Sequence, residues 1–351
     1  MSSPGYDELA RAMLAEGRLN DPWLDGEERF CVEPLRLDEA RFQALQEAAE
    51  AVAMVHEQVA SIVHDEPALL HDFFVMSPWR QMLWQAAAPS WHGIARADVF
   101  ETAAGPKVCE LNSDTPTGQP EAEWLGRYAA ARAPAGLLDP NTALRGAFVA
   151  TVRAFAASVD AGAAPATIGI VYPTEITEDL ARVALSRDWL SAGGHAVVLG
   201  SPFHLGLADD GRATLRGTPC SVLVRHYKTD CWTERLPVRD DEPPPPDDEP
   251  LREPLRVLLQ AVLQRRTAVI NPLGAVLTQN KRTLAFCWEQ LHRFPPAART
   301  AIERYLPRTE RLERCRDAVR DQRERFVLKT DYGCEGDGVV IGASVTQAEW
   351  E

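Results

Sequence analysis

The sequence predicts a mixed α/β fold, and two patterns carry that prediction. Residues 167–200 contain TIGIVYP, a helical stretch and HAVVLG, which is the strand, helix and strand order of a βαβ unit. Residues 91–112 contain two strand-like stretches joined by a Gly-Pro turn, which is typical of an antiparallel hairpin. The 351 residues, 45% of them hydrophobic, can bury a full core and favour two domains or one large composite domain.

Helices are expected to dominate the first 90 residues. Apolar side chains from Leu37 to about Ile62 recur at intervals of three and four, which predicts an amphipathic helix. Residues 77–91, SPWRQMLWQAAAPSW, are apolar and aromatic with a proline near each end, so we expect a short core helix there. Two further helices are expected after the hairpin, from Pro120 to about Ala131 and from about Thr142 to Val159.

The second half of the chain alternates helices and strands around one acidic insertion. Residues 213–228, ATLRGTPCSVLVRHYK, have a hairpin-like pattern. Residues 239–250, RDDEPPPPDDEP, place four prolines between acids and can form neither a strand ladder nor a core, which predicts an exposed loop. The remaining predicted elements are a helix at 254–266, a short strand at 267–272, a helix opened by Thr278 or Asn280 and reaching 292, and strands at 325–330 and 338–343.

The net charge of −14 limits the classes of partner. Proteins that bind nucleic acid usually carry a broad basic face, so this balance argues against a nucleic-acid partner, and any polyanionic ligand must find local cations. The chain has no apolar run of about 18 residues, and its N-terminus lacks the basic-then-apolar order of a signal peptide. We therefore expect no membrane association and a cytoplasmic location. The sequence does not fix an oligomeric state.

Cysteine and histidine give no pattern of a metal site or a disulfide framework. The seven cysteines include no C-x-x-C pair, which favours free thiols in a reducing compartment. The eight histidines form no H-E-x-x-H helix, which disfavours a histidine-based metal site. Cys109 and Cys334 lie near the candidate site described below, and the sequence leaves open whether they are redox-sensitive or packing residues.

The predicted hairpin places four polar residues together. If its turn is centred near Ala104, Asp98 lies opposite Glu110 and Arg96 lies opposite Asn112. Side chains alternate along a strand, so all four project from one face. The opposite face then carries Ala97, Val99, Cys109 and Leu111, which suits burial.

Two neighbouring carboxylates repel each other unless a cation lies between them. Oxygen ligands of this kind suit Mg²⁺, which takes one or two carboxylates together with phosphate oxygens. The alternative is a solvated hairpin in which Arg96 and Asp98 form an ordinary ion pair. The pattern of the hairpin alone does not decide between the two.

The segment after the hairpin, NSDTPTGQP, combines hydroxyls with a helix N-terminus. Ser113, Thr115 and Thr117 supply the hydroxyls, and the helix predicted from Pro120 presents free N–H groups that favour an anion. The alternative is structural: Thr117 caps the helix, or Asp114 forms an Asx-turn.

Two lysines and a glycine-rich loop provide candidate phosphate ligands. In KTDYGCEGDGVV, residues 329–340, Lys329 ends a strand and three glycines allow the backbone to approach phosphates closely. The loop does not have the Walker A pattern, and a simple turn is the alternative. Lys281 lies near the start of a predicted helix, an unfavourable end for a cation, which indicates an anion there; a surface lysine is the alternative.

Four segments together resemble the glutathionylspermidine synthase family of circularly permuted ATP-grasp ligases. They are, in order, GIARADVFE, CELNSDTPTG, NPLGAVLTQNKRTLAFCWE and FVLKTDYGCEGDGVVIG, and the similarity extends patchily over residues 90–350. The R-x-D, E-x-N-x-D-T-P-T and N-K-x-x-L-A-x-x-W-E elements are its most specific parts. The resemblance implies an ATP-grasp domain with a pre-ATP-grasp α/β domain, and metal carboxylates that precede the phosphate lysines, as they do here.

The resemblance implies a role for each matched residue. Asp98, Glu110 and Asn112 would hold Mg²⁺, and Arg96 would steady the transferred phosphoryl group or acyl phosphate. The substrate residues would be Thr115 and Thr117 and, by a looser match, Arg225 and Lys228, and the ATP phosphates would be bound by Lys281, Lys329, Gly333, Gly336 and Gly338.

The implied activity is ATP- and Mg²⁺-dependent ligation of a carboxylate to an amine. ATP would phosphorylate the carboxylate of a small molecule or peptide, and an amine would displace phosphate from the acyl phosphate. The glutathione and polyamine substrates of the family carry over least, because the residues that select them are not among the matched motifs. Two alternatives stay open: a non-catalytic nucleotide-binding or accessory protein, and an ATP-dependent phosphotransferase.

The predicted organisation has four regions. They are a helical N-terminal region at 1–90, a metal and substrate part at 91–160, a pre-ATP-grasp-like domain at 161–250, and an ATP-binding part at 251–351. About 90 residues precede the hairpin, too few for the amidase domain fused to some relatives, so hydrolase activity is not expected. Thr346 and Glu349 form a capping box near the end of the chain. The sequence ends soon after this capping box opens a helix, whereas an ATP-grasp domain needs further strands. We therefore expect the ATP-binding part to be incomplete, in either a fragment or a reduced protein.

Overall fold

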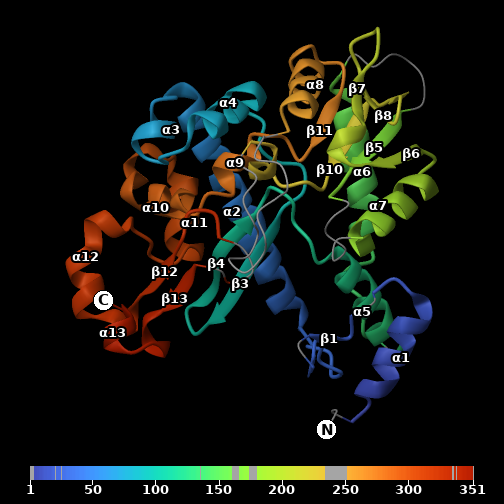
Figure 1. The fold of residues 1–351 in the computed structure, drawn as a ribbon. Helices are drawn as coiled ribbons and strands as arrows, with labels where there is room; N and C mark the ends of the chain where they lie inside the picture. The colour runs from blue at the N-terminus through green and yellow to red at the C-terminus, as the bar shows by residue number, and fades with distance from the viewer. Residues whose placement is uncertain are drawn as a thin grey trace. The chain divides into compact units, whose positions relative to one another are not determined.

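The computed structural model divides the chain into two units (Figure 1). The first comprises Met1–Glu39, Pro116–Tyr227 and Glu253–Ile270, and the second comprises Ala40–Thr115, Lys228–Arg252 and Asn271–Glu351. The described residues are 4–19, 21–24, 26–134, 136–159, 166–173, 180–233, 251–333, 336 and 338–350. The predicted acidic loop at 239–250 and Cys334 lie outside them. The four-region organisation stays a prediction.

A parallel four-stranded sheet forms the centre of the first unit. Its strand order is β11-β10-β5-β6. The strands are β5 (Thr167–Val171), β6 (Ala196–Gly200), β10 (Val222–Arg225) and β11 (Ala268–Ile270). Nearly all residues of β5, β10 and β11 are buried, as expected for parallel strands that are covered on both faces.

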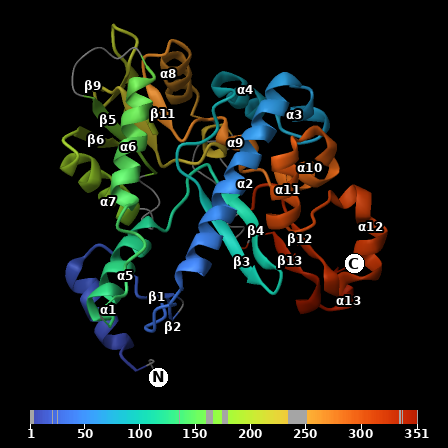
Figure 2. The same cartoon turned by 180° about the vertical axis from the view of Figure 1, so that it is seen from behind.

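The predicted βαβ unit is confirmed. Helix α7 (Leu180–Ala192) lies between β5 and β6, which pair in parallel from Thr167 with Ala196 to Val171 with Gly200. Helix α6 (Leu144–Ala157), predicted at 142–159, packs on β10 and β11 (Figure 2). Glycine is required at one end of α5 (Gln119–Arg132), the helix predicted from Pro120, because Gly118 before it has a φ of 97°.

The prediction for residues 213–228 is only partly correct. A hairpin forms between β8 (Ala213–Leu215) and β9 (Thr218–Pro219), and β7 (Leu205–Leu207) pairs with β8. Strand β10 instead joins the parallel sheet between β5 and β11. All four of its residues, Arg225 included, are buried, so it lacks the solvated face of a hairpin strand.

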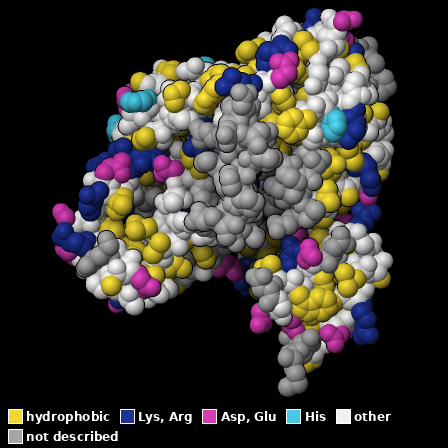
Figure 3. Space-filling model, viewed as in Figure 1, with side chains coloured by type: hydrophobic (Ala, Val, Ile, Leu, Met, Phe, Trp, Pro, Cys, Tyr) yellow, Lys and Arg dark blue, Asp and Glu magenta, His cyan; other side chains and the backbone are white. Residues whose placement is uncertain are grey.

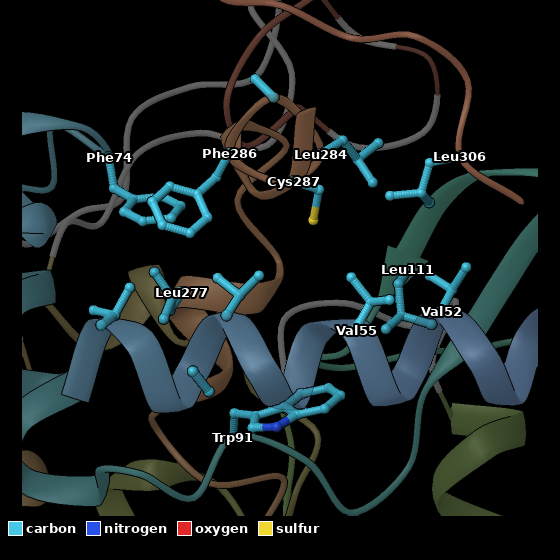
Figure 4. Close-up of a cluster of buried hydrophobic side chains, with 14 of the residues drawn as sticks. Val52, Val55, Phe74, Trp91, Leu111, Leu277, Leu284, Phe286, Cys287 and Leu306 are labelled. Atoms are coloured by element: carbon cyan, nitrogen blue, oxygen red, sulfur yellow. The ribbon is translucent and has the colours of Figure 1, made fainter. Parts of the chain in front are cut away.

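A buried core joins the helices and the hairpin of the second unit (Figure 4). Helix α2 (Glu39–Asp65), predicted from Leu37, contributes Val52 and Val55, which face the buried side chains of Leu284 and Leu306. The rings of Phe74 and Phe286 lie 5.4 Å apart in the same core. Burial of these apolar side chains, at about 25 cal/mol per Å², is the main stabilising contribution.

The remaining elements complete the two units. Helices are α1 (Tyr6–Glu16), α3 (Leu69–Asp72), α4 (Pro78–Ala87), α8 (Arg252–Leu263), α9 (Ala275–Thr278), α10 (Arg282–Glu289), α11 (Pro296–Tyr305), α12 (Leu312–Asp321) and α13 (Gln347–Trp350). Strands are β1 (Trp23–Leu24), β2 (Glu27–Glu28), β3 (Arg96–Thr102), β4 (Gly105–Asn112), β12 (Val327–Lys329) and β13 (Val339–Ile341). Short 3₁₀ helices are η1 (Pro202–His204), η2 (Asp230–Trp232), η3 (Leu291–Arg293), η4 (Arg323–Arg325) and η5 (Gly342–Ser344).

The helix predicted from Thr278 or Asn280 to 292 is present but shorter: α10 spans Arg282–Glu289, and the 3₁₀ turn η3 follows it. The backbone N–H of Lys281 donates to Asp331 O at 2.9 Å, a residue 50 positions later, instead of continuing the helical ladder. The side chain of Asn280 accepts from the backbone N–H of Arg282 at 2.8 Å, and Lys281 becomes the N-cap of α10. The capping box of Thr346 and Glu349 opens α13, as predicted.

Charged side chains of both signs lie interspersed on the visible face (Figure 3). In the part of the chain that the structure describes, no helix is both long and apolar enough to cross a bilayer.

The buried His56 on α2 makes stability depend on pH. Burial lowers its pKa from 6.5 to about 4, although Nδ1 lies 2.9 Å from Val52 O. Between these values the unfolded chain binds a proton that the folded chain excludes. The free energy of unfolding therefore falls as the pH drops from about 6.5 to 4, by about 3 kcal/mol from this residue alone.

We expect His56→Gln to unfold with a weaker pH dependence than the wild type over that range, measured by urea denaturation at several pH values. His64→Gln is the matched control, because His64 is an exposed residue of the same helix. Equal pH dependence in the wild type and His56→Gln would contradict the assignment.

Candidate functional site

The β3–β4 hairpin brings four predicted residues together by means of a β-bulge. Arg96 pairs with Asn112 and Asp98 pairs with Glu110, as the sequence predicts. The register shifts between Asp98 and Val99, so Val99 pairs with Val108 and Cys109 is the extra residue. The turn itself joins Thr102 and Gly105.

The bulge corrects the prediction for the buried face. Val108 is fully buried in the core of the second unit, together with Leu111, whereas Cys109 is only partly buried. The Cys109 thiol donates to Asp98 O at 3.3 Å. Strict alternation placed Cys109 on the core face, and the extra residue turns it out of that position.

Arg96, Asp98 and Asn112 form the more exposed side of the polar face. Arg96 Nε donates to Asp98 Oδ1 at 2.9 Å, and about 40% of both side chains is exposed. With its amide oriented to satisfy its neighbours, Asn112 donates through Nδ2 to Glu110 Oε1 at 3.2 Å and accepts at Oδ1 from Arg96 Nη2 at 3.0 Å. The ordinary Arg96–Asp98 pair anticipated as the alternative is thus present.

Glu110 joins the hairpin to both predicted phosphate lysines. Its Oε1 lies 3.2 Å from Lys281 Nζ and its Oε2 lies 3.9 Å from Lys329 Nζ. The side chains of Glu110, Lys281 and Lys329 are 17%, 9% and 28% exposed, so this cluster is the more buried part of the site. Three segments that are far apart in sequence therefore converge on one carboxylate.

The chain around Lys281 and the glycine-rich loop holds the two lysines in place. The Lys281 ammonium donates to Gly333 O, and Arg282 Nε donates to Asp331 Oδ2 at 2.9 Å. Tyr332, which follows Asp331 in the loop, donates from its hydroxyl to Val276 O at 2.9 Å. The position of Lys281 at the start of α10 is thus fixed by contacts from its main chain and from its side chain.

The predicted loop glycines have different local roles. Gly336 and Gly338 have φ values of 83° and 65°, a region that L-residues rarely adopt. At Gly338 a Cβ atom would also meet the Thr330 side chain at 2.5 Å. Gly333 contributes through its backbone, since its N–H donates to Thr330 Oγ1 at 3.1 Å and its carbonyl accepts from Lys281. These contacts are compatible with the turn that the sequence left as the alternative.

Ser113 and Asp114 are structural residues. Ser113 is fully buried, and its hydroxyl lies 2.8 Å from Thr278 Oγ1, so it does not join the predicted set of ligand hydroxyls. Asp114 accepts from the backbone N–H of Thr229 at 2.8 Å and from the Thr229 hydroxyl. Asp114 thus has a structural contact, but not the local Asx-turn offered as the alternative, because its partner Thr229 lies 115 residues away.

The remaining predicted substrate residues divide between the two units. Thr115 and Lys228 belong to the second unit, with the hairpin and the lysines, whereas Thr117 and Arg225 belong to the first. Arg225 is 97% buried at the end of β10, and its guanidinium donates to Tyr227 O. The structure thus places Arg96, Asp98, Glu110, Asn112, Lys281 and Lys329 in one cluster, and the contacts described above do not include Thr115, Thr117, Arg225 or Lys228.

Two amides that the sequence did not single out position the hairpin. Asn271 donates through Nδ2 to Ile94 O and Ser113 O, both at 2.7 Å, and to Asp114 O at 3.0 Å, and it accepts from the backbone N–H of Ile94 at 2.8 Å. Gln279 Oε1 accepts from the backbone N–H groups of Ser113 and Asp114 at 2.8 and 3.1 Å. Together they fix the chain before β3 and after β4. Both lie in the segment NPLGAVLTQNKRTLAFCWE that carries part of the resemblance, but they precede its most specific element, which begins at Asn280.

Most of the N-K-x-x-L-A-x-x-W-E element is structural. Leu284 and Ala285 are core residues, and Trp288 donates to Pro307 O at 2.8 Å. Burial would raise the pKa of Glu289, but hydrogen bonds from Arg311 and Arg314 outweigh it and hold the pKa below its usual value. Lys281 is the residue of this element that contacts the polar cluster.

The charge and the donor set of the cluster fit a metal together with a phosphate group. Arg96, Lys281 and Lys329 provide three positive charges against two negative charges of Asp98 and Glu110, a net charge of +1 in a chain of −14. Within the described part of the chain, no group of three or more His, Cys, Asp or Glu could hold a metal. Two carboxylates and an amide are a donor set for a cation that also takes phosphate oxygens, as Mg²⁺ does.

Comparison with known proteins supports the fold and does not identify a family. No family model and no curated protein matches the sequence. A solved apo structure of a glutathione synthetase-like effector from Globodera pallida is similar, with a TM-score of 0.56 and 12% sequence identity. The match covers 99% of this chain and 78% of that chain. The chain therefore has a mixed α/β fold like that of a glutathione synthetase-like protein, while the closer resemblance to glutathionylspermidine synthases stays a prediction.

We expect Asn271→Ala to destabilise the protein by about 2–4 kcal/mol, because it leaves several buried backbone groups without a partner. Urea denaturation monitored by tryptophan fluorescence measures the change. Gln46→Ala, which removes an exposed amide on α2, is the control and should change stability by less than about 0.5 kcal/mol. Equal effects of the two substitutions would show that Asn271 does not hold the hairpin.

We expect Cys109 to react slowly with thiol reagents in the folded protein. Burial raises the pKa of its thiol, and the charges of Asp98 and Glu110 act in the same direction, against that of Lys329. At pH 8, iodoacetamide should modify Cys109 roughly tenfold more slowly than the exposed Cys31, as measured by peptide mass spectrometry. The two rates should converge in denaturant. Equal rates in the folded protein would instead favour a reactive, redox-sensitive Cys109.

Proposed function

We propose that the protein is an ATP- and Mg²⁺-dependent ligase that joins a carboxylate to an amine. The observation that carries the proposal is the convergence of Lys281 and Lys329 on Glu110. The similarity to a glutathione synthetase-like structure supports the fold that this activity needs. A phosphate-binding lysine from each of two segments beside metal-type oxygen donors is an arrangement suited to phosphoryl transfer.

In this proposal the residues with oxygen donors bind the metal and the cationic residues bind phosphate. Asp98, Glu110 and Asn112 would hold Mg²⁺, which when bound would neutralise phosphate charge. Lys281 and Lys329 would bind the ATP phosphates, with the backbone of Gly333, Gly336 and Gly338 close by. Arg96, which lies beside Asp98 at the exposed side of the cluster, would stabilise charge on the transferred group. Thr115 and Lys228, which belong to the same unit as the cluster, would contact the carboxylate substrate.

The proposed reaction has two steps. A carboxylate oxygen of the substrate attacks the terminal phosphorus of ATP, and ADP leaves. The amine nitrogen then attacks the acyl carbon, phosphate leaves, and the nitrogen loses a proton. The cations and the low exposure of Lys281 and Glu110 favour this chemistry, because they place positive charge near the reacting groups and reduce access of water.

The test is release of ADP across a panel of carboxylates and amines with Mg²⁺ present. Amide formation coupled to ADP release would support the ligase. A stable phosphorylated product without an amide would support a phosphotransferase instead, and nucleotide binding without ADP release across the panel would support an accessory protein.

We expect Glu110→Gln to retain the fold and to lose at least roughly 100-fold in ADP release, because it removes a charge that would hold the metal. Circular dichroism checks the fold and a coupled assay measures the rate. Glu313→Gln is the control: it removes the same charge from a half-exposed carboxylate that pairs with Arg282, and its rate should stay within twofold of the wild type. Wild-type activity in Glu110→Gln would remove Glu110 from the site.

A further inference from the structure

Glu110 occupies the position between two cations that the proposed function assigns to phosphate. Each of its carboxylate oxygens faces a different ammonium group, at 3.2 Å from Lys281 and at 3.9 Å from Lys329. Lys281 also donates to Gly333 O, so its ammonium group interacts with both the Glu110 carboxylate and one backbone carbonyl. One carboxylate is thus shared by two lysines from different segments.

Because Glu110 is paired with both lysines, binding of phosphate alone or of a divalent cation alone must separate these ion pairs, which is unfavourable. A phosphate group that recruits the two lysines leaves Glu110 without its cations in a largely buried position, and an unpaired charge there is unfavourable. A divalent cation that recruits Glu110 likewise leaves two neighbouring ammonium groups without their carboxylate. When both ligands bind, the cation neutralises Glu110 and the phosphate groups neutralise the two lysines. Neither the carboxylate nor the ammonium groups are then left unpaired.

We propose that Glu110 couples the binding of the divalent cation to the binding of the phosphate groups, by exchanging two lysines for the metal. The inference rests on the proposed function, since it concerns the same metal and phosphate ligands. Coupling between two ligands is reciprocal, so the cation tightens phosphate binding by the same factor by which phosphate tightens cation binding.

Asp98 does not have this role, although it is the other carboxylate of the cluster. Its partner Arg96 lies two residues away on the same strand, and the side chains are 39% and 45% exposed. Water therefore screens the pair, and separating it costs little. The coupling is concentrated at Glu110, where the ion pairs are more buried and span three segments.

The test is calorimetric binding of ADP and of inorganic pyrophosphate, each with EDTA and each with excess Mg²⁺. In the wild type we expect Mg²⁺ to tighten binding at least tenfold. In Glu110→Gln the lysines are released from the carboxylate, so metal-free binding should become at least tenfold tighter than in the wild type, and Mg²⁺ should then add less than threefold. Circular dichroism of each variant confirms that the fold is retained.

Glu313→Gln is the matched control. It removes the same charge from a nearby ion pair, that of Glu313 with Arg282, without removing a carboxylate from either lysine ammonium. Its metal-free affinity should stay within threefold of the wild type. An equal gain in Glu313→Gln and Glu110→Gln would show a general effect of net charge and would overturn the proposal.

The outcomes separate this inference from the proposed function. Tight ADP binding with no gain in metal-free affinity in Glu110→Gln overturns the coupling and leaves the nucleotide site standing. The expected pattern with pyrophosphate but no binding of ADP supports the coupling and overturns ATP as the ligand. Absence of binding for both probes, with and without Mg²⁺, overturns both.

Discussion

The hydrogen bonds of Asn271 hold the open end of the β3–β4 hairpin, where the chain enters β3 and leaves β4, and the candidate site depends on that hairpin. One buried amide joins Ile94, before β3, and Ser113 and Asp114, after β4, to the chain that leaves β11. The open end of the hairpin carries Arg96, Asp98, Glu110 and Asn112, so these contacts position the polar face. Ser113 and Asp114 are buried, so loss of the amide would leave their carbonyl groups unsatisfied where water has little access.

The polar face of the hairpin could be predicted from the sequence, although the prediction did not include the β-bulge that produces the pairing. The turn is centred between Ala103 and Ala104, so without the bulge Asp98 would lie opposite Cys109 instead of Glu110. The extra residue restores the pairing of the polar side chains. A trace of the bulge exists in the sequence, because the two buried residues of β4, Val108 and Leu111, are three positions apart and not two. A strand without a bulge would place them on opposite faces.

Helices and neighbouring strands could be predicted because their hydrogen bonds are local and repeat with the period of the side chains. The contacts that close the site are neither local nor repeated. Asn271 reaches Ile94 across 177 positions, and the backbone N–H of Lys281, at the start of α10, donates to Asp331 O, 50 positions later. A single amide or one diverted N–H leaves no periodic pattern, so the sequence predicted which residues are polar and could not predict what holds them.

The matched motifs mix residues of two kinds, and the structure separates them by their contacts. Glu110 faces two lysines, while Asp114, four positions later in the same motif, is held by Thr229 and supports the loop. Lys281 likewise faces the cluster, while Glu289 in its motif is buried between two arginines. Asp114 and Glu289 are each held by hydrogen bonds or ion pairs from neighbouring side chains. In the cluster, two lysines share one carboxylate, so positive charge exceeds negative charge where exposure is low. That excess is what an anionic ligand would neutralise, and it arises because two lysines from different segments lie beside a single carboxylate.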